Sequence, residues 1–418
     1  MKKSDFPVFT NNLGLVYLDS AASSQKPAEV IDWVAEFLRS SYSNIHRGHY
    51  SLSEKSEELF FQSKKMVAKL VNSQAHEVIY TYNSTFAFNL VAQTLCINGK
   101  LGAGDVVLLS VLEHHANIVP WHHLSKQYGF TVDFVWINQN PDIDSLDKSH
   151  RDHKHFESGH FDYEDFEKKY TKNVKVVSLT AASNVTGEIL DLQRISDQLR
   201  DETFFIVDGS QGVPHFQLDF QKLGADFLIF TAHKIMADTG LGVLVARQEL
   251  MKELEPSIVG GGAIGGVTTS WFSFKSGVEK WEPGTPNIVW AVSLLKALEY
   301  LEKIGGYQTL EDIEKKLMSR ALERFRGYGD QIELIGSDKL ENRLGIFSFV
   351  LKNQKNIQMV GELFAEKWIC VRSWGHCTHP LYQYLGTSNG SIRMSLYGYN
   401  DEADLERFFE VLDEMVGK

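Results

Sequence analysis

Two short apolar runs in the middle of the chain constrain its fold more than any other feature. Residues 204–207 and 227–230 are rich in aromatic and β-branched side chains, and turn residues bound both runs. Runs of this length and composition are typical of strands that are buried on both faces of a parallel sheet. Because similar runs alternate with helical patterns along most of the chain, the sequence predicts a doubly wound, mainly parallel α/β sheet.

Polar residues follow both runs. Asp208 comes directly after the first run, and Thr231, His233 and Lys234 come after the second. Ligands of open α/β sheets bind at the carboxyl ends of the strands, so these side chains are expected to share one site. A lysine there can form an imine with an aldehyde cofactor, and a carboxylate on the neighbouring strand can keep a pyridinium nitrogen protonated, as pyridoxal 5′-phosphate chemistry requires. Spacing alone leaves it equally open that Asp208 caps a turn and that Lys234 is a surface lysine.

Composition and charge exclude several classes of protein. The 418 residues are 43% hydrophobic and 23% charged, which is ordinary for a globular protein. A net charge of −12 argues against nucleic acid as a partner, because phosphate backbones are bound by basic surfaces. No apolar run reaches the length of a membrane span, and the N-terminus lacks the apolar segment of a secretory signal, so no membrane partner is expected. Cys96, Cys370 and Cys377 form no disulfide framework, which favours a cytoplasmic location.

Several motifs resemble those of the class V, fold-type I enzymes that depend on pyridoxal phosphate. VDGSQ around Asp208 and TAHK at Lys234 are similar to the cofactor motifs of that family. Further motifs, in the family's order, indicate the branch of Suf-type cysteine desulfurases and selenocysteine lyases: YLDSAASSQKP, IHRGHYSLS, EHHANIVPW, PGTPN and RSWGHC. The resemblance covers nearly the whole chain. It implies a large cofactor-binding sheet domain at residues 15–288 and a smaller α+β domain formed by residues 1–14 and 289–418.

The resemblance also implies which residues hold the cofactor. Lys234 carries it as an imine, Asp208 pairs with the ring nitrogen, and Gln211 bonds the ring oxygen. His114 stacks on the ring and takes part in catalysis. The phosphate-binding residues are Ser84, Thr85, Thr231, His233 and, from the other subunit of a homodimer, Thr285. Without the resemblance, a plain helix cap at residues 83–85 and a hydrogen-bonded loop histidine at 114 would be the simpler interpretations, and Asn83 stands where many family members have glycine.

Residues 371–380, with the sequence VRSWGHCTHP, contain a candidate nucleophile. Cys377 lies between His376 and His379, and cationic neighbours increase the thiolate fraction and hence the reactivity of a cysteine. An inert buried thiol and a zinc site are the alternatives, and zinc would need a fourth ligand or an open catalytic position. In the family this cysteine takes the substrate's sulfur as a persulfide. Residues 373–375 depart from the glycine and histidine that many members have there, which bears more on specificity than on reaction type.

Candidate substrate-binding residues complete the set. Arg393 begins a strand-like segment, and a guanidinium fork can hold an amino-acid carboxylate through two parallel hydrogen bonds. A surface salt bridge is the alternative. The resemblance implies that Arg393 and Arg372 bind the substrate carboxylate, that Asn184 reaches this carboxylate or a cofactor oxygen, and that His46, on a polar loop, lies close to the substrate.

Two segments interrupt the alternation of strands and helices. Residues 138–160 are polar and lack apolar periodicity, so we expect a surface insertion. The insertion contains four histidines that could bind a metal: His150, His153, His155 and His160. No rigid element is predicted to hold them, so no metal site is expected. Residues 259–267 include five glycines, which predicts a flexible loop, and the resemblance implies that it lies near a dimer interface.

The sequence therefore predicts a cytoplasmic, homodimeric, pyridoxal-phosphate-dependent cysteine desulfurase. It would convert L-cysteine, and L-selenocysteine in the alternative of a selenocysteine lyase, to L-alanine. The sulfur would pass through Cys377 to an acceptor protein for iron–sulfur cluster assembly or another sulfur-donor pathway. Two further hypotheses are another class V enzyme, such as a transaminase or an epimerase, and an inactive protein of this fold. Cys377 argues against a transaminase, and the presence of Lys234, Asp208 and Arg393 together argues against an inactive protein.

Overall fold

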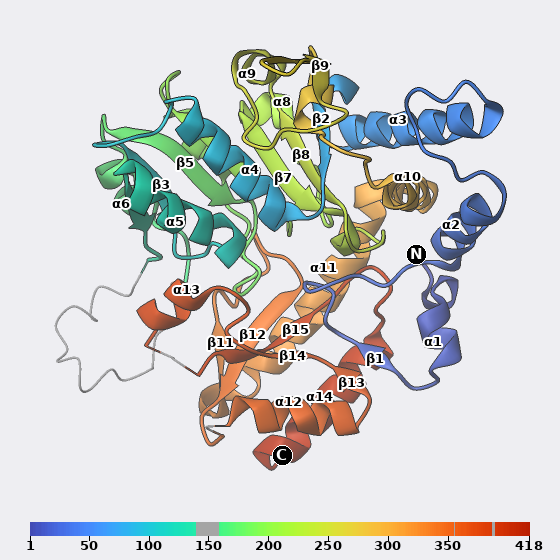
Figure 1. The fold of residues 1–418 in the computed structure, drawn as a ribbon. Coiled ribbons are helices and arrows are strands. Elements are labelled where there is room, and N and C mark those ends of the chain that lie inside the picture. Colours follow the sequence, from blue (N-terminus) through green and yellow to red (C-terminus); the bar gives the residue numbers. More distant parts are fainter. Residues whose placement is uncertain (139–158, 355, 387–388) are drawn as a thin grey trace.

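A central sheet forms the larger of two regions in the computed structural model, which describes residues 1–138, 159–354, 356–386 and 389–418 (Figure 1). Among these residues the sheet has seven strands in the order β2-β8-β7-β6-β5-β3-β4. The strands are β2 (Val78–Thr81), β3 (Val106–Ser110), β4 (Thr131–Val135), β5 (Val174–Thr180), β6 (Phe204–Asp208), β7 (Phe227–Thr231) and β8 (Gly242–Ala246). The strands from β7 to β4 are parallel, and β8 is antiparallel to both of its neighbours, so the predicted mainly parallel sheet is confirmed.

Both faces of this sheet are buried, because successive side chains of a strand point to opposite faces. Phe205 and Val207 of β6 belong to one apolar core, and Ile206 belongs to the other. Each such side chain stabilises the fold by about 1.5–3 kcal/mol when it is fully buried. One core is completed by α4 (Ser84–Ile97), α5 (Val119–Tyr128) and α9 (Gln248–Glu253).

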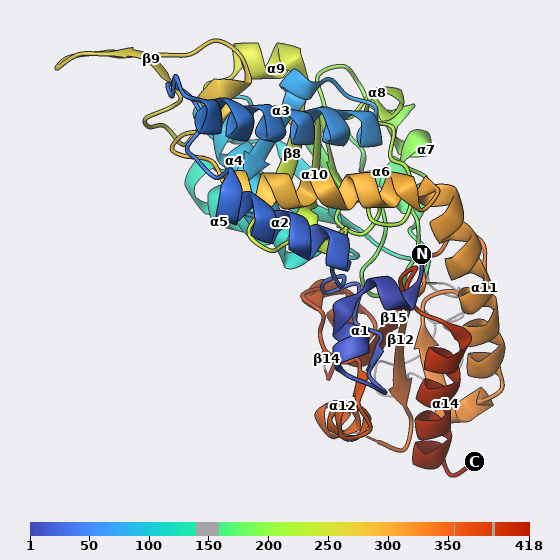
Figure 2. The same ribbon diagram turned by 90° about the vertical axis from the view of Figure 1, so that its right-hand side faces the viewer.

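The second core is covered by a thicker layer of helices. The helices of this layer are α2 (Ala28–Ser40), α3 (Ser51–Val71), α6 (Tyr163–Lys169), α7 (Leu192–Ser196), α8 (Phe220–Leu223) and α10 (Ile288–Lys303). Figure 2 shows α10 between α2 and α3, and it packs against both.

The smaller region is an antiparallel sheet with helices against it (Figure 1). Its strands, in the order β11-β12-β15-β14, are β11 (Ile332–Ile335), β12 (Ile346–Leu351), β15 (Ser391–Ser395) and β14 (Arg372–Trp374). The helices that pack in the core of this region are α11 (Gly306–Arg326), α12 (Ile357–Glu366) and α14 (Glu402–Val416). The short helix α13 (His379–Tyr384) instead places Leu381 and Tyr382 in a core of the larger region. The predicted α/β fold with a smaller α+β domain is confirmed.

The N-terminal segment crosses to the smaller region. After α1 (Pro7–Asn11), strand β1 (Val16–Tyr17) pairs in parallel with β13 (Ile369–Cys370), and Val16 and Leu18 lie in the core of the smaller region. In contrast, α10 packs with the larger region. This packing favours a division after α10 rather than before it, and the predicted domain boundaries stay a prediction.

One of the two interrupting segments is more regular than expected. Within residues 259–267, β9 (Ile264–Val267) pairs with β10 (Phe272–Phe274) as an antiparallel hairpin that projects from the body of the protein (Figure 2). The expectation of a loop was therefore wrong for residues 264–267. Backbone hydrogen bonds hold this hairpin together, so glycines can form it without large apolar side chains.

The other segment lies largely outside the described residues, including His150, His153 and His155. His160 is described, and its Nδ1 lies 3.3 Å from Oε1 of Glu188. In the described ranges no group of three or more His, Cys, Asp or Glu side chains could hold a metal ion. Within the same ranges, no helix is both long and apolar enough to cross a membrane.

Candidate active site

A cavity of about 430 Å³ lies at the carboxyl ends of the central strands, a volume that suits a small cofactor together with a small substrate. The cavity includes the topological switch point of the sheet, between β3 and β5. Here the chain continues from β3 to β4 on one side of β3, whereas β5 lies on the opposite side. Ligands of open α/β sheets bind at this position. All predicted site residues except His46 and Thr285 line the cavity: Ser84, Thr85, His114, Asn184, Asp208, Gln211, Thr231, His233, Lys234, Arg372, Cys377 and Arg393.

Lys234 and Asp208 come from neighbouring parallel strands, as predicted. Asp208 ends β6, and Lys234 follows β7 in a short 3-10 turn. Burial lowers the pKa of Lys234 to about 8, although the charge of Asp208 acts against this shift. A lysine with such a pKa is partly neutral near physiological pH, and only the neutral amine can attack an aldehyde.

The carboxyl group of Asp208 is held in one orientation. It is 4% exposed, and Oδ1 accepts a hydrogen bond of 2.9 Å from the backbone N–H of Ser210. Burial raises its pKa, while the hydrogen bonding of Ser210 and the charge of Lys234 act in the opposite direction. A buried carboxylate in this position is stabilised by a nearby cation, and a protonated ring nitrogen of a ligand would provide one.

Two of the three histidines that line the cavity, His114 and His233, are held neutral. Burial, followed by the charge of Lys234, lowers the pKa of His114 to about 3. Its Nδ1 accepts a hydrogen bond of 3.1 Å from the N–H of Ala116, so the ring proton lies on Nε2. Burial likewise lowers the pKa of His233 to about 4. A neutral imidazole can stack on an aromatic ring or bond a ligand oxygen without bringing a positive charge into the site.

Three buried nitrogen atoms at the cavity have no hydrogen-bond partner within the described part of the chain. They are Nδ1 of His233, Nδ1 of His376 and Nε of Arg393. Buried polar atoms in folded proteins almost always have partners, so a polar ligand is expected here. Together with a partly neutral lysine and a buried carboxylate, these atoms fit pyridoxal 5′-phosphate and an amino-acid substrate.

The start of α4 carries two of the residues that are predicted to bind a phosphate group, Ser84 and Thr85. Asn83 is the N-cap, and its side chain accepts a hydrogen bond of 2.8 Å from the N–H of Phe86. Ser84 and Thr85 begin the helix and line the cavity. Free N–H groups and hydroxyls at a helix start favour the binding of an anion. The helix start that the sequence predicted at residues 83–85 is therefore confirmed, and phosphate binding there stays a prediction.

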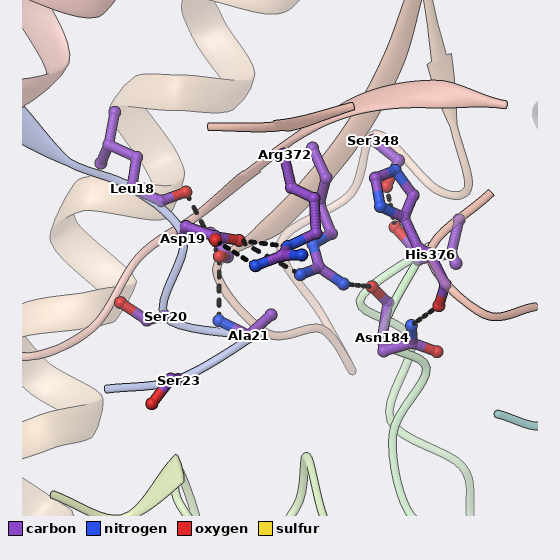
Figure 3. Close-up of polar contacts among 12 residues, drawn as sticks. Leu18, Asp19, Ser20, Ala21, Ser23, Asn184, Ser348, Arg372 and His376 are labelled. Carbon is purple, nitrogen blue, oxygen red and sulfur yellow. Dashed lines mark hydrogen bonds and ion pairs between the residues drawn. The ribbon is translucent and has the colours of Figure 1, made fainter. Parts of the chain in front are cut away.

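Asp19 joins the two predicted arginines (Figure 3). Its Oδ1 and Oδ2 accept hydrogen bonds of 3.1 and 2.8 Å from Nε and Nη2 of Arg372, and Oδ1 lies 3.4 Å from Nη2 of Arg393. The second fork nitrogen of Arg393, Nη1, donates to the backbone oxygen of Asn184 at 3.0 Å. Sequence reasoning did not assign a role to Asp19, although its position just after β1, in the motif YLDSAA, was a usable signal.

Cys377 is the accessible thiol of the protein. It is exposed and lines the cavity, whereas Cys96 is buried and Cys370 is partly buried. Burial raises the pKa of Cys96 to about 12 and also raises that of Cys370. This agrees with the prediction that Cys377 is the best placed of the three for chemistry at the cavity. His376 is buried, and its Nε2 lies 3.0 Å from Oγ of Ser391.

Two predicted residues lie away from this cavity. His46 precedes α3, and its Nδ1 lies 3.1 Å from Oε1 of Glu57. Thr285 is exposed just before α10. In contrast, Thr180, the last residue of β5, and Ser210, within the motif VDGSQ, line the cavity although the sequence analysis assigned neither of them a role.

A family model described as aminotransferase class-V matches residues 16–408. The chain belongs to the class V aminotransferase family. This membership agrees with the lysine and aspartate at the ends of neighbouring strands and confirms the resemblance noted in the sequence.

Named relatives in the family are similar over nearly their whole length. A probable cysteine desulfurase of Aeropyrum pernix is 33% identical, with 99% of this chain and 97% of that protein covered. A probable cysteine desulfurase of Pyrococcus abyssi is 32% identical, with 96% and 94% covered. The solved structure of a cysteine desulfurase from Thermococcus onnurineus has a TM-score of 0.88 at 30% identity, with 99% of this chain and 97% of that one covered. These similarities confirm the fold-type I architecture.

Proposed function

We propose that this class V enzyme is a pyridoxal-phosphate-dependent cysteine desulfurase that converts L-cysteine to L-alanine and takes up the sulfur on Cys377 as a persulfide. The observation that carries the proposal is the position of an exposed thiol, Cys377, on the same cavity as Lys234 and Asp208. The relatives named probable cysteine desulfurases support it, because they align with this chain from end to end.

The residues at the cavity hold the cofactor in the proposed enzyme. When bound, pyridoxal phosphate supplies an electron sink for the negative charge left on the substrate's Cα. Lys234 would attach it covalently, Asp208 would keep the proton on the ring nitrogen, and the neutral ring of His114 would stack on the ring. Gln211 bonds the ring oxygen, and its Nε2 is already fixed by donation to the backbone oxygen of Ala21 at 2.9 Å. The phosphate is bound by Ser84, Thr85, Thr231 and His233.

Lys234 also moves the substrate's proton in this proposal. A general base works best when its pKa is near the working pH, and burial has lowered the pKa of Lys234 to about 8. The neutral amine of Lys234 would take the proton from the substrate's Cα and later return a proton to the carbon skeleton.

Arg393 binds the substrate carboxylate, with Arg372 and Asn184 beside it. The guanidinium of Arg393 is buried, and its Nε has no partner in the described structure, so it has a donor to offer. Asp19 holds both arginines in place and offsets part of their charge. The carboxylate of the substrate therefore enters a site where donors are already oriented, which reduces the entropy lost on binding.

Cys377 carries out the sulfur step. Its thiolate attacks the sulfur of bound cysteine, and an S–S bond forms as the C–S bond of the substrate breaks. The product is a persulfide on an exposed residue, where an acceptor protein can reach it. We include in the proposal a sulfur-acceptor protein for iron–sulfur cluster assembly or another sulfur-donor pathway, and a cytoplasmic location.

A homodimer completes the proposal. Thr285 is exposed and does not line the cavity of its own chain, which is compatible with donation to the phosphate in the neighbouring subunit. His46, also outside the cavity, is assigned to the substrate on the family resemblance alone.

Mass spectrometry tests the proposed function directly. After incubation of the cofactor-loaded enzyme with L-cysteine and no reductant, the peptide containing Cys377 should gain one sulfur atom. Cys377→Ser should keep the cofactor and bind cysteine but lose persulfide formation by several orders of magnitude, because a hydroxyl is a far weaker nucleophile toward sulfur. Cys370→Ser is the matched control and should keep the activity. Sulfur on Cys96 or Cys370 instead, or full activity of Cys377→Ser, would refute the mechanism.

A further inference from the structure

The loop that carries Cys377 has an unusual backbone conformation. The φ angle is 114° at Trp374, 45° at His376 and 58° at Cys377. Residues with a side chain rarely adopt positive φ, and they keep it only where surrounding contacts impose it. Contacts with neighbouring parts of the protein must therefore hold this loop.

Asn184, after β5, supplies the first of these contacts. Its Nδ2 donates to the backbone oxygen of His376 at 2.8 Å, and its Oδ1 accepts a hydrogen bond of 3.0 Å from Oγ1 of Thr378 (Figure 3 shows Asn184 and His376). Asn184 is 6% exposed, so these bonds are shielded from water. They fix the residues on both sides of Cys377.

His115, at the start of a 3-10 turn that follows β3, supplies the second set of contacts. Its backbone N–H donates to the backbone oxygen of Cys377 at 2.8 Å. Its ring Nε2 accepts a hydrogen bond of 3.2 Å from the N–H of His379, and the two imidazole rings meet edge to face with centroids 4.5 Å apart. His115 and Asn184 thus bond every residue from His376 to His379.

The ring of His115 is in the form that this role needs. A backbone N–H can only donate, so Nε2 must be unprotonated, and the neutral ring has its proton on Nδ1. Burial, and then the neighbouring His379, lowers the pKa of His115, which favours the neutral ring.

We propose that His115 is a positioning residue for sulfur transfer, whose ring holds the loop so that the thiol of Cys377 faces the cavity. The inference rests on the proposed function, because persulfide formation requires this thiol to reach the substrate's sulfur. His115 is absent from the residues that line the cavity in the described structure, so it acts through Cys377. Reacting atoms must come within about 3–3.5 Å, and a displacement of about 1 Å can slow a reaction about 100-fold.

Substitution of the ring tests this role. His115→Leu removes the acceptor and keeps the backbone N–H. We expect kcat for cysteine to fall about 10- to 100-fold while KM changes less than about threefold, because the substrate-binding groups are untouched. His115→Gln offers an amide oxygen to the N–H of His379 and should recover kcat to within about threefold of the wild type. His123→Leu, an exposed histidine on α5, is the matched control and should leave both constants unchanged.

Amide hydrogen exchange, measured without cysteine, reports directly how firmly the Cys377 loop is held. Exchange at Thr378 and His379 in the cofactor-loaded protein should become about tenfold faster in His115→Leu, because one hydrogen bond is lost. Thr378→Val removes the hydrogen bond to Asn184 and should likewise lower kcat and accelerate exchange in the loop. This variant provides a second test if His115→Leu does not fold.

The proposed role of His115 requires both a lower kcat and faster amide exchange in the loop. Wild-type exchange or wild-type kcat in these variants would overturn it. If the wild type forms no persulfide on Cys377 while exchange still rises in His115→Leu, the proposed function fails and the hydrogen-bonded loop remains established.

Discussion

Burial determines the chemistry of single residues at the cavity. Lys234, His114 and His233 all have lowered pKa values, and burial is the largest cause for each. Because burial disfavours the charged form, three basic side chains can surround one small cavity without strong mutual repulsion. The positive charge that remains belongs mainly to the arginines, which Asp19 partly offsets.

Covalent attachment of the cofactor is the first prediction at this scale. The wild type should have an absorbance band near the edge of the visible range, and after borohydride treatment the adduct should be found on the peptide containing Lys234. Lys234→Ala should lose both the band and the adduct, whereas Lys222→Ala, at an exposed lysine, should keep them. An adduct on another lysine, or a wild type that stays colourless with added cofactor, would contradict the assignment.

Glu113 gives a pH-dependent prediction. It is fully buried, and its carboxyl group accepts hydrogen bonds from Oγ of Ser110 (2.6 Å), Nδ2 of Asn117 (2.8 Å) and the N–H of Thr180 (3.0 Å). Burial raises its pKa from 4.5 to about 8, so between these values the folded state binds more protons than the unfolded state. The stabilisation from this group is therefore complete below about pH 4.5 and is lost as the pH rises to about 8, by at most about 1.4 kcal/mol per pH unit.

Urea unfolding of cofactor-free protein across this pH window measures the effect. The free energy of unfolding of Glu113→Gln, relative to the wild type, should rise as the pH increases, because the amide stays neutral. Glu54→Gln, at an exposed position, should follow the wild type. A constant difference between Glu113→Gln and the wild type would show that Glu113 does not titrate in this window.

At the scale of elements, short patterns specify where helices and strands begin and end. The sequence predicted that a helix begins at Asn83-Ser84-Thr85, and α4 does begin at Ser84 with Asn83 as its N-cap. The hairpin β9–β10 shows the limit of such patterns, since its glycines predicted a loop. Backbone pairing between exposed strands leaves little trace in side-chain composition.

Two substitutions of Asn83 separate its contribution to the helix cap from its influence on phosphate binding at the helix start. Asn83→Ala removes the acceptor of the N–H of Phe86 and should lower the free energy of unfolding by about 1 kcal/mol. Asn83→Asp keeps the cap and the stability, but its charge should repel a phosphate group at the helix start and weaken cofactor affinity. Urea unfolding and fluorescence titration of the cofactor-free protein measure the two effects. Wild-type affinity in Asn83→Asp would place the phosphate elsewhere.

At the scale of the whole molecule, the proposed dimer predicts complementation between inactive chains. Lys234→Ala and Thr285→Ala chains, once mixed and exchanged, should form heterodimers in which one of the two sites is intact. Desulfurase activity should therefore exceed that of either variant alone. The control is a mixture of Lys234→Ala and Cys377→Ser chains, which should gain no activity because both residues belong to the same cavity of one chain. If mixing never raises the activity of the first pair after subunit exchange is confirmed, Thr285 does not act on the neighbouring site.

The sequence by itself determined the strands of the central sheet and the chemistry at their ends. Residues 204–207 and 227–230 are apolar throughout because both faces of their strands are buried, so Asp208 and Lys234 could be placed at one sheet edge. Such signals can be recognised in the sequence, because they depend only on residues that are close together along the chain.

Only the tertiary structure decided which distant side chains meet. Asp19 bonds Arg372 and Arg393 because β1, β14 and β15 come together in the smaller region beside the cavity. His115 and Asn184 reach the Cys377 loop because the two regions pack against each other. These contacts join residues that are hundreds of positions apart, and they depend on how two separately patterned sheets fit together. No local periodicity encodes that fit, so the contacts of Asp19 and of His115 could not be predicted from the sequence alone.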